Sequence, residues 1–83
     1  MRRRPTVAVA GLGLVGGSLA LALRRAGYRV IGVDRAGVLR RARAAGAITV
    51  VRGDVRKAAE ESDVVVLAAP PAANRTLLRR LAS

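Results

Sequence analysis

The stretch Val7–Gly27, VAVAGLGLVGGSLALALRRAG, decides the fold of this 83-residue chain. At its centre lies Gly11-Leu-Gly13-Leu-Val-Gly16, a Gly-x-Gly-x-x-Gly turn. The turn directly follows a β-rich apolar run, Thr6–Gly11, which predicts a strand covered on both faces. It directly precedes a run with helical spacing that ends at a glycine, which predicts a helix. A strand, a glycine turn and a helix in this order are typical of a dinucleotide-binding unit.

The rest of the chain continues the alternation of strand and helix. Further strands are predicted over Tyr28–Asp34, Ala47–Val51 and Asp63–Pro71, and further helices over Gly37–Gly46, over Asp54–Glu61 with Asp54 as its cap, and from Ala73 onward. Short connections in such an alternation predict right-handed crossovers and a parallel sheet with helices on both faces. The predicted fold is therefore α/β, a partial Rossmann-type doubly wound parallel sheet of about four strands in three α/β/α layers. Residues 1–5 are expected to be a basic tail, and residues 6–83 the folded domain.

Each residue of the turn has a physical reason to bind a phosphate. Gly11 can take the backbone angles of a sharp turn, and Gly13, having no Cβ, lets the main chain approach a pyrophosphate. Gly16 lets the helix lie close to the strands. The amides around Leu14 and Val15 would point at the phosphates from the positive end of the helix dipole.

Two further positions complete the predicted cofactor site. Asp34 ends the second strand, where a carboxylate can accept both hydroxyl protons of the adenosine ribose and repel a 2′-phosphate, which favours NAD over NADP. Arg35 weakens that preference, because its guanidinium could stack on adenine or meet a phosphate. Ala69 and Pro70 end a strand expected beside the first, where cofactors lie in such sheets, although they could equally only terminate that strand.

Composition removes several kinds of chemistry. The chain has no Cys and no His, so disulfides, thiolate chemistry and imidazole catalysis are excluded within it, and no metal site is predicted. The net charge of +11 suggests nucleic acid or an anionic surface when taken alone. The arginines, however, are spread over the ends of predicted helices, one short helical segment and the amino-terminal tail, and Tyr28 is the only aromatic residue. Stacking aromatics usually accompany base recognition, so no nucleic-acid partner is expected.

The same amino-terminal stretch also imitates a secretory signal or a membrane span. Arginines at Arg2–Arg4 precede an uncharged run from Pro5 to Leu23, and Ala20-Leu-Ala22 resembles a cleavage site. The glycines between Gly11 and Gly17 count against an uninterrupted helix. Removing the segment would also leave Asp34 without a loop to partner. We therefore expect a cytoplasmic protein with no membrane partner.

The runs VAVAGLGLVGGSLALALRRAG, VIGVDR and DVVVLAAPP resemble the amino-terminal NAD(P)-binding domain of the prephenate and arogenate dehydrogenase family of tyrosine biosynthesis. The distinctive element is the doubled glycine and serine, Gly16-Gly17-Ser18. The resemblance implies an oxidoreductase that decarboxylates prephenate to 4-hydroxyphenylpyruvate, or arogenate to tyrosine, while hydride passes to NAD. It also implies a homodimer in the full-length family. Another NAD(P)-dependent dehydrogenase, such as a β-hydroxyacid type, and a non-catalytic dinucleotide- or nucleic-acid-binding module are the alternatives.

The departures from this family bear on activity. The family's catalytic histidine, substrate-binding arginine and dimerisation domain lie beyond the region of resemblance, so no catalytic residue can be carried over. Gly11, Gly13, Gly16 and Asp34 match cofactor positions, and Ala69 and Pro70 match them less securely. The chain is thus expected to be the cofactor-binding part of a dehydrogenase, either truncated before the catalytic half or with its remainder encoded elsewhere, and inactive alone. With its last strand exposed at an edge, it is expected to be marginally stable and prone to associate.

Overall fold

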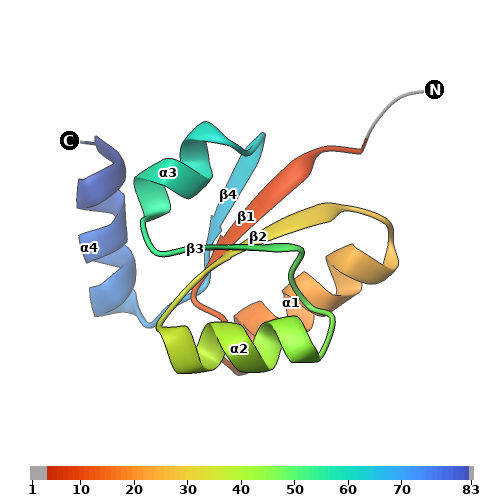
Figure 1. Cartoon of the computed structure of the whole chain (residues 1–83). Helices are drawn as coiled ribbons and strands as arrows, with labels where there is room; N and C mark the ends of the chain where they lie inside the picture. The colour runs from red at the N-terminus through yellow and green to blue at the C-terminus, as the bar shows by residue number, and fades with distance from the viewer. Residues whose placement is uncertain (1–3, 83) are drawn as a thin grey trace.

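The computed structural model describes residues 4–82, which form one parallel sheet covered by helices on both faces (Figure 1). The strands are β1 (Thr6–Ala10), β2 (Arg29–Val33), β3 (Val50–Arg52) and β4 (Val64–Leu67), and the helices are α1 (Leu14–Arg25), α2 (Ala36–Ala44), α3 (Val55–Glu60) and α4 (Pro71–Ala82). The strand order is β3-β2-β1-β4, and every pairing is parallel. The predicted doubly wound α/β fold is therefore confirmed.

The sheet has a hydrophobic core on each face because successive side chains of a strand point to opposite sides. Val7 and Val9 of β1 join one core with α1 and α2, whereas Ala8 and Ala10 join the other with α3 and α4. Figure 1 shows the two helix pairs on opposite sides of the sheet. The central strands β1 and β2 are buried almost throughout, whereas β3 and β4, at the edges, are only partly buried. This explains the near-continuous apolar sequence of the first two strands.

Helix α1 forms where its sequence predicts, but it meets the core mainly through small residues. Gly16 and Ala20 are its buried positions. Leu14 and Val15 are 89% and 74% exposed, and Leu19 is also exposed. The small side chains let the first half of the helix approach the sheet closely, whereas Leu21 and Leu23, nearer its end, are partly buried and pack against the core.

The third strand is shorter and later than predicted. It covers Val50–Arg52, whereas the sequence predicts Ala47–Val51. Ala47 and Ile48 are buried in the core beside α1 and α2 instead. The hydroxyl of Thr49 accepts a hydrogen bond from the backbone N–H of Val30 at 3.2 Å, and the backbone N–H of Thr49 donates to the carbonyl of Val30 at 2.8 Å. Because the N–H of Val30 meets a side-chain acceptor at Thr49, the contact differs from a regular backbone ladder, and the strand pairing begins with Ile31 and Val50.

The last helix begins at Pro71, two residues earlier than predicted, and the preceding strand ends at Leu67 instead of Pro71. Proline is well suited to the first position of a helix, because the N–H that it lacks has no partner inside the helix there. The backbone N–H of Asn74 donates to the carbonyl of Pro70 at 2.9 Å. Pro70 thus ends the connection from the strand, and Pro71 opens the helix.

The amino-terminal segment contacts the domain. Residues 1–3 of the predicted basic tail lie outside the described residues, but the guanidinium of Arg4 lies 5.5 Å from the centroid of the Tyr28 ring. Within residues 4–82, none of the helices has the length and apolarity to cross a membrane. The same residues contain no cluster of three or more acidic side chains that could hold a metal ion.

Helix α3 carries the predicted cap at Asp54, whose carboxylate accepts a hydrogen bond from the N–H of Arg56 at 3.1 Å. The same carboxylate oxygen pairs with the Arg80 guanidinium of α4 at 3.2 Å. The N–H of Arg56 and then the guanidinium of Arg80 hold the pKa of Asp54 below its ordinary value of 3.8. The carboxylate therefore joins the start of one helix to the neighbouring helix.

The lowered pKa predicts how this cap responds to acid. A carboxyl whose folded pKa lies below its unfolded pKa stabilises the fold above the unfolded value, and that contribution is lost as the pH falls through the folded value. We expect Asp54→Asn, which keeps an oxygen for the N–H of Arg56, to lose less stability than the unsubstituted chain below about pH 4. Urea unfolding midpoints at pH 7, 4, 3 and 2 would measure this. Equal losses in the two proteins would contradict it.

Candidate functional site

A cavity of about 940 Å³ opens at the carboxyl ends of β1, β2 and β4. Its lining residues are Gly11, Gly13, Val33, Asp34, Arg35, Val38, Gly53, Ala68, Ala69, Pro70, Ala73, Thr76 and Leu77. Six of the nine predicted site residues are therefore brought together here: Gly11, Gly13, Asp34, Arg35, Ala69 and Pro70. Leu14, Val15 and Gly16 do not line the cavity and belong to the first turn of α1. The carboxyl edge of a doubly wound sheet is the expected place for a ligand.

Gly11 turns the chain out of β1 and lies against the end of β4. Its φ of +96° is a conformation that other residues rarely adopt. A Cβ on Gly11 would lie 2.6 Å from the backbone nitrogen of Ala69. Gly11 also donates its N–H to the carbonyl of Val33 at 2.9 Å. One glycine therefore links the carboxyl ends of the three strands that surround the cavity.

Gly16 fixes how closely α1 approaches this turn. A Cβ at this position would overlap the carbonyl oxygen of Gly11 and lie 3.1 Å from the Cβ of Ala68. The neighbouring Gly17 is different, since a Cβ there would lie 3.4 Å from the nearest atom, the carbonyl oxygen of Leu12. Of the doubled glycine, Gly16 is thus the position where the packing excludes a side chain.

Gly13 leaves room in front of the helix. Apart from its own chain neighbours, no atom of the described residues would lie within 4 Å of a Cβ built on Gly13. Gly13 occupies the position just before α1, and no side chain there accepts a hydrogen bond from the helix. The first turn of α1 also contains no acidic residue. The first N–H groups of a helix lack partners within the helix, and they attract anions. The chain therefore presents free space and backbone donors at the position that the motif predicts for a phosphate.

Asp34 is tied directly to the glycine turn. One carboxylate oxygen accepts the N–H of Leu12 at 2.7 Å, and the other accepts the N–H of Arg35 at 2.7 Å. These charge-assisted bonds fix the carboxylate at the end of β2. Each oxygen retains a further lone pair that could accept a hydroxyl proton. One hydrogen bond thus joins the glycine turn to the acid at the end of β2, between residues that lie 22 positions apart in the chain.

The exit from β4 is bound by Asn74, a residue of α4 that no sequence motif singles out. Asn74 of α4 accepts the N–H of Ala69 through Oδ1 at 3.0 Å and donates through Nδ2 to the carbonyl of Leu67 at 3.3 Å. Its signal in the sequence is a short amide side chain in the first turn of a helix, just after Pro70 and Pro71. Gly53, Thr76 and Leu77 also line the cavity without having been predicted.

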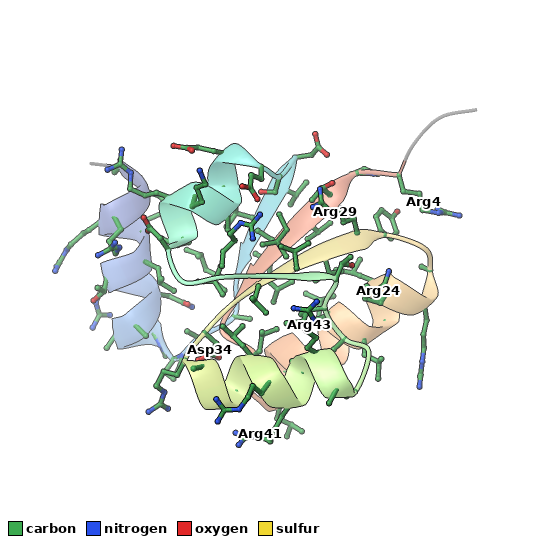
Figure 2. All side chains as sticks on the ribbon, viewed as in Figure 1. Arg4, Arg24, Arg29, Asp34, Arg41 and Arg43 are labelled. Atoms are coloured by element: carbon green, nitrogen blue, oxygen red, sulfur yellow. The ribbon has the colours of Figure 1, made fainter. Side chains whose placement is uncertain are left out.

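The basic side chains are not concentrated at this cavity. Arg35 is the one arginine among the lining residues. Figure 2 places Arg4, Arg24 and Arg29 at the far end of the sheet from Asp34. The described helices α1 and α4 carry arginines in their last turns, as the sequence predicts. The local charge at the cavity is therefore one carboxylate and one guanidinium, in a chain whose net charge is +11.

Comparison with known proteins gives a family for this arrangement. The model of the family described as NADP oxidoreductase coenzyme F420-dependent matches residues 6–83. The chain belongs to this family. Within this oxidoreductase family its similarity extends to a prephenate dehydrogenase of Lactococcus lactis subsp. cremoris (strain MG1363), to which it is 33% identical over 79 residues. That alignment covers 93% of the chain and 22% of the relative.

Solved structures agree with this assignment. The Synechocystis arogenate dehydrogenase superposes with a TM-score of 0.84 at 28% identity, covering 92% of this chain and 27% of that one. A prephenate dehydrogenase from A. aeolicus, in complex with hydroxyphenyl propionate and NAD+, gives a TM-score of 0.82 at 28% identity, covering 94% and 29%. The predicted resemblance to prephenate and arogenate dehydrogenases is confirmed. This member of the family spans about a quarter of the length of these relatives.

The two adjacent glycines of α1 provide a matched test of the packing. Gly16→Ala is expected to lower the free energy of unfolding by about 2 kcal/mol or more, because the new methyl group must displace backbone atoms. Gly17→Ala is expected to leave stability unchanged or raise it by up to about 1 kcal/mol, because alanine favours helix and meets no clash. Urea unfolding of both variants measures the difference. Equal effects of the two substitutions would show that Gly16 is not in close contact with the turn.

Proposed function

We propose that this chain is the NAD-binding portion of a prephenate or arogenate dehydrogenase. The observation that carries the proposal is the 2.7 Å hydrogen bond between the N–H of Leu12 and the carboxylate of Asp34. It joins the glycine turn to the acid at the end of the second strand, the two features that together recognise a dinucleotide. The similarity to dehydrogenases over nearly the whole chain supports the same reading.

The strand order suggests how the cofactor lies. The pyrophosphate is proposed to sit at Gly13, against the backbone N–H groups of Leu14, Val15 and Gly16 at the start of α1. The adenosine ribose would meet Asp34 on β2. Because β4 lies on the opposite side of β1 from β2, an extended dinucleotide would place its nicotinamide half toward Ala69 and Pro70. The size and position of the cavity at this edge of the sheet agree with this arrangement.

NAD is proposed as the preferred cofactor, although the family description names NADP. A 2′-phosphate placed near Asp34 would face a carboxylate that two backbone N–H groups hold in place. The similar prephenate dehydrogenase from A. aeolicus was solved with NAD+. Arg35 is the residue that could favour NADP, because its guanidinium lines the same cavity.

The chemistry of the whole enzyme is proposed from the resemblance. When bound, the nicotinamide would accept a hydride from the substrate, and the residues of this chain would hold the cofactor in place for that transfer. Residues 6–83 would form the cofactor-binding part of the domain, and the catalytic and substrate-binding groups would come from outside these residues. The resemblance supports a homodimer for that longer enzyme and a place in the cytoplasm.

Gly13→Val tests the phosphate site with little risk to the fold, since a side chain there meets open space and the φ of Gly13 is −70°. We expect the unsubstituted chain to bind NADH, with only weak dependence on salt, and the variant to bind at least about tenfold more weakly. Fluorescence titration at two salt concentrations, beside thermal melting of both proteins, measures this.

A duplex oligonucleotide serves as the competing ligand in the same titration. Binding to the oligonucleotide that falls steeply with salt and is unaffected by Gly13→Val would support a nucleic-acid module instead. Binding of NADH that the substitution leaves unchanged would contradict the proposed phosphate site.

Cofactor preference is tested at Asp34. Asp34→Ser is expected to raise the affinity for NADPH relative to NADH, because it removes the charge facing the 2′ position. Asp34→Asn is the matched variant, since its amide oxygen can still accept the N–H of Leu12 while the charge is gone. An affinity ratio that neither substitution changes would remove Asp34 from the cofactor site.

A further inference from the structure

We propose that Asn74 is a positioning residue that holds the Ala68–Pro70 segment in place as the wall of the nicotinamide half of the site. The inference rests on the proposed function, because it assigns a role within the same cavity. The helix explains the reach of Asn74: side chains of a helix tilt toward its amino end, so an amide in the first turn of α4 faces the chain that enters the helix.

The two hydrogen bonds of Asn74 bracket the exit from β4. Its Oδ1 accepts the N–H of Ala69 at 3.0 Å, and its Nδ2 donates to the carbonyl of Leu67 at 3.3 Å. The side chain is half-buried. It therefore fixes one backbone donor and one backbone acceptor on either side of Ala68, at the point where the strand ends and the chain turns toward Pro70.

The position of Ala69 matters because the glycine turn is built against it. A Cβ on Gly11 would lie 2.6 Å from the backbone nitrogen of Ala69 and 2.8 Å from its Cα. Ala68 likewise lies close to the start of α1, since a Cβ built on Gly16 would lie 3.1 Å from the Cβ of Ala68. There is thus little free space between the Ala68–Pro70 segment and the phosphate turn, and a displacement of the segment would change the shape of the cavity beside β4.

The effect of Asn74 should depend on how far a ligand reaches across the sheet. In the proposed arrangement, ADP would extend from the ribose position at Asp34 to the phosphate position at Gly13 and would end before β4. NADH continues past the phosphates toward Ala69 and Pro70. Loss of the Asn74 hydrogen bonds should therefore weaken NADH binding and leave ADP binding unchanged. A general loss of stability would weaken both ligands alike.

The experiment measures the Kd of NADH and of ADP by calorimetry for the full chain and three variants. Asn74→Ala removes both hydrogen bonds and is expected to raise the Kd of NADH about fivefold, the equivalent of one hydrogen bond, without changing that of ADP. Asn74→Asp retains an acceptor for the N–H of Ala69 and is expected to restore part of the loss. Leu78→Ala, on the same helix with a side chain 58% exposed and outside the cavity lining, is the control.

Equal Kd values of NADH in Asn74→Ala and the unsubstituted chain would overturn the proposal, as would a parallel weakening of ADP. If the unsubstituted chain binds neither ligand, the proposed function is wrong, and the role in cofactor binding falls with it. Amide exchange followed by NMR tests the positioning separately. The Ala69 amide is expected to exchange about tenfold faster in Asn74→Ala than in the control. Equal rates would show that Asn74 does not hold the backbone of Ala69 in place.

Discussion

The arrangement of the site depends on one steric constraint, the close contact between the amino end of α1 and the turn that leaves β1. A side chain at Gly16 would overlap the carbonyl of Gly11, and a side chain at Gly11 would meet the backbone of Ala69. Because both positions lack a Cβ, helix, turn and neighbouring strand come together at the carboxyl edge of the sheet. The first turn of α1 can then direct its backbone N–H groups toward the space before Gly13.

Polar side chains complete this edge by binding the backbone. Asp34 accepts the N–H of Leu12 on one side of Gly11, and Asn74 accepts the N–H of Ala69 on the other. Asp34 lies 22 residues from Leu12 along the chain, and Asn74 lies in the first turn of the helix that follows Ala69. Hydrogen bonds of this kind fix loops that the sheet alone would leave less constrained, and they do so without adding positive charge to the site. The net charge of the chain is thus a poor guide to its ligand.

Much of the fold could be predicted from local patterns because each pattern has a local cause. The apolar runs of β1 and β2 are buried on both faces, and Asp54 caps α3 through its own neighbour Arg56. The sequence predicts the third strand too early because its start depends on how Thr49 meets Val30, a residue 19 positions away in the chain. The sequence predicts the start of α4 too late, because Pro71 follows Pro70 and resembles part of the exit from the strand, whereas it opens the helix.

The sequence by itself determined the strand and helix order, the glycine turn and the acid that ends the second strand, because periodicity, glycine and charge act over a few residues. Only the tertiary structure decided that α1 approaches the sheet through Gly16 and Ala20 while Leu14 and Val15 face outward. It also decided that Asp34 binds the turn through Leu12 and that Asn74 joins the site. These features are contacts between segments that come together at the edge of the sheet. Which segments come together there follows from the packing of the whole chain.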